Sequence, residues 1–542
     1  MKFKLFLLAS AAIGLCGLSV LGQSYAVTNA RIVTVSGATI ERGTVVVRNG
    51  LIEAVGANVT APADAQVFDG NGLTVYPGLF DAFTTLGLQA ATRPAGGGGP
   101  SAQQAQAATS NSNYPAGLRP EDLTEEELRS GEAQFEAARN AGFTTALTVG
   151  RTGIMNGRSA VINLAGDSVS GMILRSPAAL HISFATIPGQ YPGSLLGMFS
   201  ATRQMFYDAQ RLKAMQAAYA ANPKGMRRPE ADRSLEALIP VLDRQIPLVV
   251  NANRETEIIR AIGIAKEFNL RLIIAGGQEA GKVADRLKAI DAAVLLSLNF
   301  PKRTASASPD ADPESLDLLR FRAEVPKTAG KLAQAGVRFA FQSGGMTSLS
   351  DFTANAAKST ENGLNRDAAI RAMTLSAAEV FGIADRTGSV DAGKIANLTV
   401  VRGDILGKEK TVTHVFVDGK LFEPKAPPPS APRPNGGGGN VNVATVAGSF
   451  SINIEIPGQS LTGTLVLVQQ GAQLSGTMQT QLGTTQIKDG KVTANGFEFS
   501  ASVNVGEATV DIIVRGTATG NQVSGTIDSN QGNFPFTGTR NP

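Results

Sequence analysis

Residues 248–296 read LVVNANRETEIIRAIGIAKEFNLRLIIAGGQEAGKVADRLKAIDAAVLL, and this stretch decides the fold. Short apolar runs with the length of buried strands lie at 248–250, 272–274 and 293–296. Between the first two runs, residues 254–269 place Ile258, Ile262 and Ala265 on one helical face, at a period of about 3.6 residues. Residues 283–290 repeat that pattern before the third run. This order of strand, helix and strand predicts parallel βα units.

The same alternation extends over residues 77–385. Further strand-like runs lie at 146–149 and 339–341, and residues 324–335 have a helical period. A (β/α)8 TIM-like barrel fits this length, and in such barrels the chemistry takes place at the C-terminal ends of the strands. Residues 92–116 are rich in Ala, Gln, Ser and Gly, which predicts a flexible insertion after the first barrel strand.

Two strand-like segments flank this middle section, at 23–76 and 386–422. Asn49-Gly50 joins two β-branched or apolar runs in the first segment, and Asp418-Gly419 does so in the second. Both dipeptides are strong hairpin signals, because the turn residues need positive φ.

Residues 423–440 are rich in proline and then glycine, which predicts a linker to a separate C-terminal module at 441–542. A motif of one apolar residue, Ser or Thr, Gly and Thr recurs there, at 461–464, 474–477, 523–526 and 536–539. Together with alternating apolar and polar residues, the repeat predicts an antiparallel all-β domain, closed as a small barrel or sandwich. The glycines are expected at bends or where strands approach closely.

The first 22 residues predict a secretory signal peptide. Lys2 and Lys4 precede an apolar run from Leu5 to Leu18, and small residues follow before Gln23. We therefore expect a periplasmic or secreted protein with no membrane span in the mature chain. An uncleaved anchor and a lipid on Cys16 are the alternatives.

Composition excludes several kinds of site. The 542-residue chain contains two histidines, His181 and His414, and one cysteine, Cys16. A zinc site built from several His or Cys ligands is therefore impossible in the mature chain, as is a disulfide framework. The net charge of +4 comes without a run of Lys or Arg, so a nucleic-acid role has no support.

Three segments carry distinctive motifs: YPGLFDAFTTLG at 76–87, AGFTT at 141–145 and GSVDAGKIANL at 388–398. Together they resemble the amidohydrolase superfamily, and in particular its exported, imidazolonepropionase-like members. Residues 76–87, YPGLFDAFTTLG, resemble the first barrel strand, written P-G-L-I-D-A-H-x-H-L-G in the family. AGFTT at 141–145 and GSVDAGKIANL at 388–398 resemble two further family motifs. The likeness spans about residues 25–422. It implies a (β/α)8 barrel and a small composite β-sandwich domain that both flanks build together.

The resemblance also implies a catalytic metal, zinc or another divalent ion, that activates water to hydrolyse C–N bonds. Family members hold it through the H-x-H pair, histidines after the fifth and sixth strands and an aspartate after the eighth. This sequence lacks the family's ligand residue at each of these positions. The residues found there are Phe83, Thr85, Asn251 or Asn253, Gln278 and Gly344. Phenylalanine offers no lone pair and amides are weak ligands, so we expect no metal and no cofactor.

Other polar residues near these positions are candidates for ligand binding. For Asp81, the role of a buried hydrogen-bond acceptor is favoured over that of a catalytic base. For Arg254, an anchor for an anionic ligand and a solvated charge at the start of a helix both stay open. Ser343 adds a hydroxyl to the amides of Asn251, Asn253 and Gln278, which form neutral hydrogen bonds. His181 lies in an apolar run and is expected in the core or at its rim; His414 is expected to be structural.

Three functions stay open. The first is a pseudoenzyme that binds a small polar or peptide-like ligand, or that forms an oligomer with itself or with an active amidohydrolase paralogue. The second is a working C–N hydrolase with a displaced or metal-free site. The third is a carrier barrel for a binding module at 441–542.

Overall fold

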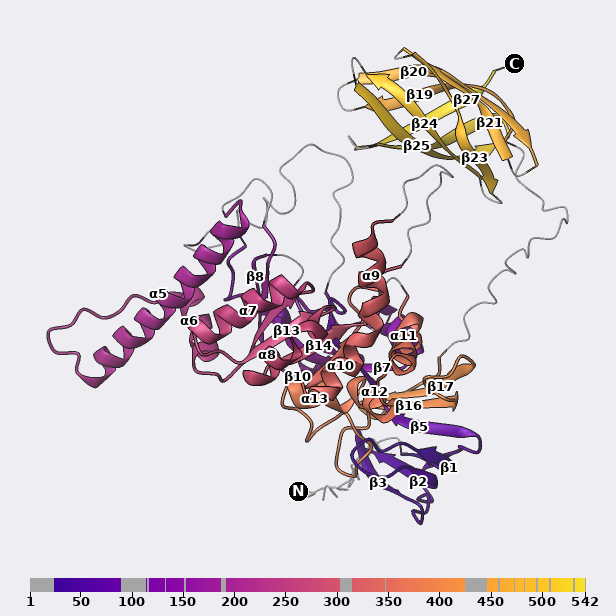
Figure 1. Cartoon of the computed structure of the whole chain (residues 1–542). Helices are drawn as coiled ribbons and strands as arrows, with labels where there is room; N and C mark the ends of the chain where they lie inside the picture. Colours follow the sequence, from indigo (N-terminus) through magenta and orange to yellow (C-terminus); the bar gives the residue numbers. More distant parts are fainter. Residues whose placement is uncertain are drawn as a thin grey trace, which may run out of the picture. The chain divides into compact units, whose positions relative to one another are not determined.

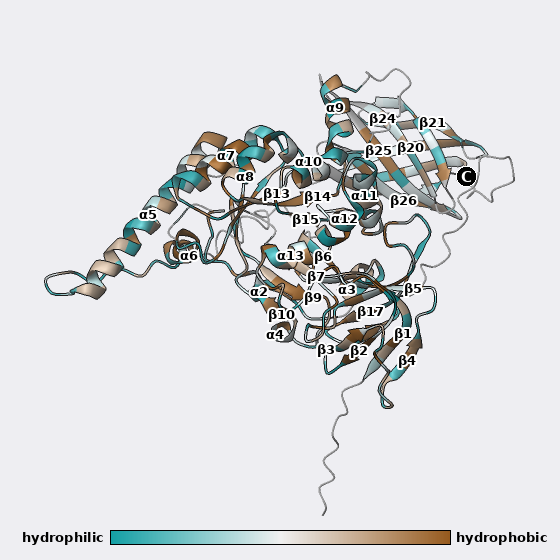
Figure 2. Cartoon of the chain, turned by 60° about the horizontal axis from the view of Figure 1, so that its bottom comes forward, coloured by the Kyte–Doolittle hydropathy of each residue, from teal (hydrophilic) through white to brown (hydrophobic). Residues whose placement is uncertain are grey.

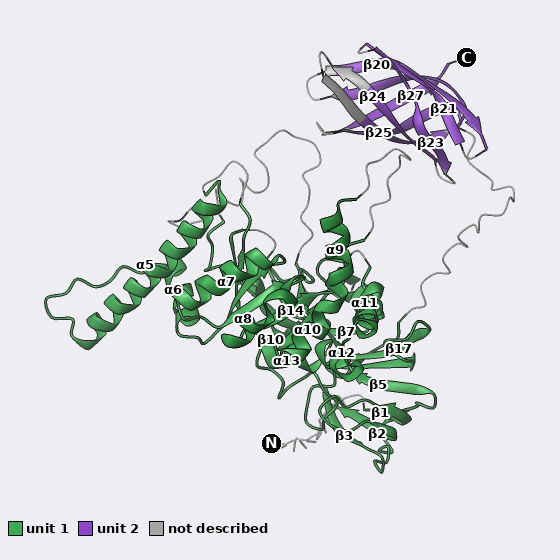
Figure 3. Cartoon of the chain, viewed as in Figure 1, with its two compact units in different colours: residues 1–303, 314–426 green, residues 304–313, 427–542 purple. Residues whose placement is uncertain are grey.

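The structure is a computed structural model. It describes residues 24–88, 114, 117–131, 133–150, 153–186, 192–302, 314–346, 348–424 and 446–541, the last range with short gaps at 457–458, 472, 482, 494–495, 506–507 and 530–531. The predicted signal peptide, the predicted insertion except Tyr114, and the predicted linker from residue 425 lie outside the described residues. The chain divides into two compact units, which are described separately (Figure 3).

Parallel strands and intervening helices form the centre of the first unit (Figure 1). Strands β6 (Leu79–Thr84) and β7 (Phe143–Thr148) pair in parallel. A second parallel run comprises β11 (Leu180–Ser183), β12 (Leu248–Ala252), β13 (Leu272–Gly276), β14 (Ala293–Ser297) and β15 (Phe339–Gln342). Helices α7 (Glu255–Glu267) and α8 (Ala284–Ala289) lie between strands where the sequence predicts them. The mixed α/β class is confirmed.

Antiparallel strands interrupt the parallel runs. Strands β8 (Met155–Arg158), β9 (Ala160–Asn163) and β10 (Ile173–Arg175) pair antiparallel to β11, β7 and β9 respectively. Among the described residues these central strands therefore form two hydrogen-bonded sheets, β10-β9-β7-β6 and β15-β14-β13-β12-β11-β8. A contact between Asp81 of β6 and Ser343, just after β15, joins one end of each sheet. Closure into a (β/α)8 barrel stays a prediction.

Helices account for much of the rest of the first unit. Before β12 these are α2 (Thr124–Glu127), α3 (Ala133–Asn140), α4 (Val169–Met172), the 27-residue α5 (Leu195–Ala221) and α6 (Arg233–Leu242). After β13 follow the 3₁₀ helix η1 (Ala280–Val283), α9 (Leu316–Glu324), η2 (Val325–Lys327), α10 (Thr328–Gln334), α11 (Ser350–Glu361), α12 (Arg366–Ala372) and α13 (Leu375–Val380). No described helix is both long and apolar enough to cross a lipid bilayer.

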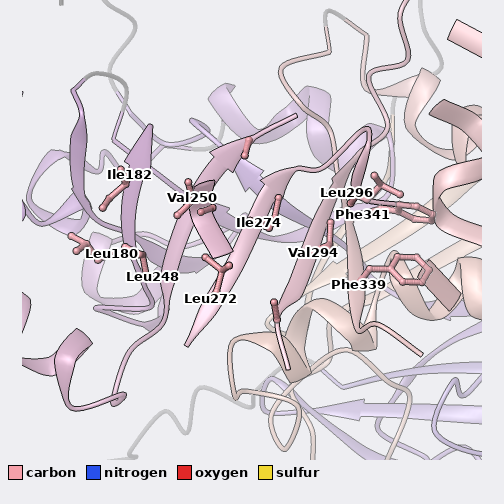
Figure 4. Close-up of a cluster of buried hydrophobic side chains, with 14 of the residues drawn as sticks. Leu180, Ile182, Leu248, Val250, Leu272, Ile274, Val294, Leu296, Phe339 and Phe341 are labelled. Atoms are coloured by element: carbon pink, nitrogen blue, oxygen red, sulfur yellow. The ribbon is translucent and has the colours of Figure 1, made fainter. Parts of the chain in front are cut away.

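The central strands are buried on both faces. Alternate residues such as Leu248, Ile274 and Leu296 pack in a core shared with the helices (Figure 4). Their neighbours, such as Val249 and Ile273, join a second core with residues of β6, β7 and α13. Two-sided burial explains why these strands are continuous apolar runs rather than alternating ones.

A mixed sheet combines strands from both flanks of the chain. Its order is β18-β17-β16-β5-β1-β2-β3, with β4 paired to β1. The strands are β1 (Tyr25–Ile32), β2 (Ile40–Arg48), β3 (Leu51–Gly56), β4 (Gln66–Asp69), β5 (Leu73–Pro77), β16 (Leu398–Gly403), β17 (Lys410–Val417) and β18 (Lys420–Phe422). Much of β1 to β3 consists of hydrophobic residues, which are brown in Figure 2. Asn49 and Asp418 have positive φ, which confirms both hairpin turns.

The second unit is an antiparallel barrel, which confirms the separate all-β domain. Its strands are β19 (Gly448–Ile456), β20 (Gln459–Gln470), β21 (Gln473–Thr480), β22 (Gly483–Gln486), β23 (Lys488–Thr493), β24 (Gly496–Val505), β25 (Ala508–Thr519), β26 (Gln522–Ser529) and β27 (Gly532–Arg540). Strand β27 pairs with β19, and β21 pairs with both β20 and β23, so the ring closes, with β22 beside β21.

Side chains fill the interior of this barrel. Phe450, Leu465, Phe499 and Phe536 are buried in one cluster. The motif glycines lie where strands approach closely: a Cβ on Gly476 would lie 1.9 Å from the Val466 carbonyl oxygen, and one on Gly525 would lie 2.0 Å from that of Arg515. The close approach predicted for these glycines is therefore confirmed.

Candidate functional site

The sequence-predicted residues lie at the C-terminal ends of the parallel strands. Phe83 lies in β6, Asn251 in β12, Gln278 two residues beyond β13, and Ser343 and Gly344 directly after β15. The carboxyl edge of a parallel sheet brings such positions together, as the βα fold predicts. Asp81 contacts Ser343, Asn253 lies against Gly276, and Arg254 and Gln278 line one pocket. The described contacts connect neither Thr85 nor the exposed Asn251 to the other candidates.

Asp81 ties the two sheets together. Its Oδ1 accepts hydrogen bonds from the backbone N–H of Ser343 at 2.9 Å and from that of Phe83 at 3.3 Å. The side chain is fully buried, and Oδ2 has no hydrogen-bond partner within the described chain. Burial raises the pKa of Asp81 to about 6, because the charged form loses its hydration. A carboxyl group that titrates near neutrality therefore lies at the junction of β6 and β15.

Glu279, three residues beyond β13, contacts residues that follow β12. Its carboxylate accepts a hydrogen bond from the Glu255 N–H at the start of α7, at 2.8 Å, and one from Lys282 Nζ at 3.0 Å. Arg254 Nη1 lies 3.4 Å away. Burial alone would raise the pKa of Glu279, but these hydrogen bonds and cations outweigh burial and hold that pKa below its ordinary value. Glu279 is therefore charged, and its negative charge is stabilised by the positive N-terminal end of the α7 dipole.

A pocket of about 460 Å³ opens beside Glu279. Its lining comes from the start of α7, from η1 and from α9 to α10, and comprises Arg254, Gln278, Glu279, Gly281, Lys282, Asp317, Arg320, Phe321, Glu324, Val325, Thr328 and Lys331. The Arg254 guanidinium carbon lies 4.0 Å from the centre of the Phe321 ring, a cation–π contact. The sequence predicts Arg254 and Gln278 as candidate ligand-binding residues, whereas no pattern in α9 points to Phe321 as a partner.

The positions where the family places metal ligands have other contacts. The Phe83 ring lies 5.7 Å from the ring of His181. Gln278 donates from Nε2 to the Asn299 carbonyl oxygen at 3.0 Å. Gly344 has a φ of +61°, and a Cβ there would lie 2.1 Å from Ser297 Oγ, so this position has no room for an aspartate. The backbone at Gly344 favours glycine for steric reasons.

The histidines do not provide a metal site. His181 is buried, its Nε2 lies 2.8 Å from Ser159 Oγ, and burial lowers its pKa to about 3, so the ring is neutral. Its Nδ1 has no hydrogen-bond partner within the described chain. His414 lies in the flanking sheet, where its ring packs 4.9 Å from Phe68. Within the described ranges, no three His, Cys, Asp or Glu side chains gather as metal ligands would. The donor set therefore does not fit the family metal.

Comparisons with known proteins agree with the fold. A sequence model of the amidohydrolase family matches residues 316–422. A solved amidohydrolase from Thermotoga maritima MSB8 is 26% identical with a TM-score of 0.61, and the match covers 74% of this chain and 100% of that one. An adenosine deaminase from Xanthomonas campestris with bound zinc is 17% identical with a TM-score of 0.42, covering 74% and 92%. No curated protein matches the chain. The chain is therefore similar to the amidohydrolase family in sequence over residues 316–422 and to a solved amidohydrolase in fold.

Proposed function

We propose that this protein is a member of the amidohydrolase superfamily that binds a small polar or peptide-like ligand without metal-dependent hydrolysis. The observation that carries the proposal is the pair Phe83 and Thr85 on and just after β6, where the family motif has two histidines. In the family, the metal supplies a hydroxide at neutral pH. A phenyl ring cannot bind a metal ion through a lone pair, and a hydroxyl or an amide binds one weakly.

The pocket beside Glu279 is the proposed ligand site. It combines the cations Arg254, Lys282 and Lys331 with the carboxylates of Glu279 and Glu324. A ligand that carries both an ammonium and a carboxylate, as a dipeptide does, finds groups of opposite charge for each. The flat face of Phe321 supports the Arg254 guanidinium, which is suited to bidentate recognition of a carboxylate.

Metal content and hydrolysis test this proposal together. The purified protein is incubated with zinc, manganese or iron(II), desalted and analysed by elemental mass spectrometry, and then assayed with dipeptides and cyclic amides. We expect a stoichiometry far below one ion per chain and no turnover. The F83H/T85H variant is the matched control, because it restores the two imidazoles of the motif. One firmly held ion per wild-type chain, with turnover, would overturn the proposal.

Ligand binding has its own test. A dipeptide panel is titrated by isothermal calorimetry against the wild type, R254Q and F321A, with R402Q as the control on an exposed arginine of β16. We expect binding to weaken in R254Q and F321A and to stay unchanged in R402Q. Equal affinities in all four proteins would remove the pocket from the proposal.

A metal-free hydrolase is the second candidate, and Asp81 favours it. The pKa of about 6 and the unpartnered Oδ2 are properties of a general base that works near neutral pH. If Asp81 is that base, hydrolysis of a C–N bond rises with an apparent pKa near 6 and disappears in D81N. Turnover that persists in D81N would exclude this residue as the base.

We further propose that the protein is exported, because residues 2–22 have the charged, apolar and small-residue order of a signal peptide. N-terminal sequencing of the protein from its native cells tests this, with cleavage expected before Gln23. Association with itself or with an active paralogue is part of the same proposal, and native mass spectrometry of the exported fraction tests that association.

A further inference from the structure

A groove of about 690 Å³ crosses four strands of the C-terminal barrel. The strands are β26, β27, β19 and β20, which follow one another around the ring; Figure 1 shows β19, β20 and β27 in yellow and orange. The lining residues are Ser451, Ile452, Asn453, Thr462, Gly463, Thr464, Gln522, Val523, Ser524, Thr537, Gly538 and Thr539. None of the twelve carries a charge, although the barrel has charged residues elsewhere, such as Arg515, Glu498 and Asp528.

Strand register arranges the polar residues of the groove in two rows. The first row runs Ser524, Thr537, Asn453 and Thr462, each paired with the next across neighbouring strands. The second row runs Gln522, Thr539, Ser451 and Thr464. Neighbours within a row are about 4.8 Å apart, and the rows are separated by two residues, about 7 Å along the strand.

The floor between the rows consists of residues that face the barrel interior. They are Val523, Gly538, Ile452 and Gly463, which pair across the same strands. A Cβ on Gly538 would lie 2.8 Å from Cγ2 of Ile452 and 3.0 Å from Cγ1 of Val523, both core side chains. Because successive side chains of a strand point to opposite faces, the hydroxyls on either side of each glycine point outward.

This arrangement accounts for three of the four copies of the repeated motif. The glycine of the motif faces the barrel interior, and the flanking Ser or Thr hydroxyls face outward. The copies at 461–464, 523–526 and 536–539 all contribute to the groove, whereas the copy at 474–477 on β21 does not. Core packing alone accounts for the glycine and the apolar residue, but it does not require outward hydroxyls.

The polar side chains of the groove are largely free to bind a ligand. Among the eight in the two rows, and within the described part of the barrel, only Ser451 has a side-chain hydrogen-bond partner, Asn541, at 2.6 Å. Asn453 Oδ1 is shielded from solvent and has no hydrogen-bond partner within the same described residues. A buried acceptor without a donor costs free energy, so a ligand hydroxyl that reaches it gains more than one that replaces an existing bond.

We propose that this groove binds a neutral polysaccharide chain lying across β26, β27, β19 and β20. Sugar hydroxyls both donate and accept hydrogen bonds, as do the Ser and Thr hydroxyls and the amides of the two rows. A charged polymer finds no opposite charge among the lining residues, and an apolar ligand would strip water from hydroxyls without replacing their hydrogen bonds. An added peptide strand finds no free edge among these four strands, since each is paired on both sides.

Binding to polysaccharides tests the proposal on the full-length protein. Dextran, amylose, cellulose and chitin serve as neutral probes, and heparin and polygalacturonate serve as charged ones. We expect retention on at least one neutral probe and none on the charged ones. The T462V/T537V variant removes two hydroxyls of the first row with little change of shape, and we expect it to weaken binding roughly tenfold, at a few-fold per hydrogen bond.

The matched control is T477V/T526V. It changes threonines of the same motif on β21 and β26 that do not line the groove, so we expect wild-type binding. Equal weakening in both variants would mean that the groove is not the site. Absence of retention on all four neutral probes, or retention on the charged probes alone, would overturn the proposal. Because the proposed ligand site of the first unit is unchanged in these variants, the two proposals fail independently.

Discussion

Two carboxyl groups near the strand ends of the first unit have opposite surroundings. Asp81, at the β6–β15 junction, is fully buried, and its hydrogen-bond donors are backbone N–H groups that contact one oxygen. Glu279, beyond β13, has a partly exposed side chain and contacts Lys282, Arg254 and the first turn of α7. The pKa of Asp81 is raised to about 6, whereas the pKa of Glu279 is lowered.

This comparison shows that cations decide whether a shielded carboxylate keeps its charge. The hydrogen bonds from Ser343 and Phe83 do not compensate for full burial at Asp81, whereas a helix terminus and two cations more than compensate at Glu279. The stability of the β6–β15 junction thus depends on shape and hydrogen bonds, and the stability of the ends of β12 and β13 depends on charge. Substitutions at Gly344, Asp81 and Glu279 separate these two dependences.

Gly344→Ala has the largest expected effect. The residue has positive φ, and the new Cβ would lie 2.1 Å from Ser297 Oγ and 3.2 Å from the Asn299 Cβ. We expect a loss of about 3 to 4 kcal/mol in the free energy of unfolding, measured by urea denaturation, from strain and overpacking together. Gly345→Ala is the control: its φ is also positive but the Cβ meets open space, so about 1 to 2 kcal/mol is expected. Equal losses would show that crowding at this junction is not important.

Asp81→Asn tests the raised pKa. A folded-state pKa of about 6, above the ordinary 3.8, means that the folded protein holds the proton more tightly than the unfolded chain. The contribution of Asp81 is therefore fully present below pH 4 and is lost as the pH rises through 6, by about 3 kcal/mol in total. The variant should lack this decline when urea melts are compared from pH 4 to pH 8. Glu361→Gln, a change on the exposed end of α11, should keep it. A parallel decline in D81N would assign the titration to another group.

Glu279→Gln has a smaller effect with the opposite pH dependence. Its lowered pKa means that the carboxylate stabilises the fold above pH 4.5 and that this stabilisation is lost as the pH falls through the folded-state value. We expect a loss of about 1 to 2 kcal/mol at pH 7 that shrinks in acid, measured by thermal unfolding.

Glu324→Gln is the matched control for Glu279. Lys327 and Lys331 lower the pKa of Glu324 to about 2, but its side chain is 45% exposed, so solvent screens the pairs. We expect a loss of only a few tenths of a kcal/mol, roughly the value of a surface pair. A loss as large as that of Glu279→Gln would contradict the distinction between shielded and exposed carboxylates.

Much of the fold could be predicted because its signals are local. The apolar runs at 248–250, 272–274 and 293–296 form β12, β13 and β14, and the helical period of residues 254–269 forms α7. The turns at Asn49-Gly50 and Asp418-Gly419 have the expected positive φ at Asn49 and Asp418. Each of these features depends on neighbours within a few residues, so the local pattern contains the information.

The candidate site was only partly predictable. Composition limited its chemistry, since two histidines in 542 residues cannot supply the family metal site. Arg254 and Gln278 were named from the strand ends, but their pocket partner Phe321 comes from α9, whose position depends on long-range packing. Sequence patterns likewise do not reveal that Ser343 donates to Asp81, because these residues are 262 positions apart.

The sequence by itself determined the order of strands and helices, the separate all-β module and the scarcity of histidine and cysteine, because periodicity and composition are properties of the chain alone. Tertiary structure decided which carboxyl group is buried without a cation, how the ring from β19 to β27 closes and which hydroxyls share a groove. Those outcomes depend on strand register and desolvation, which exist only once distant segments pack together.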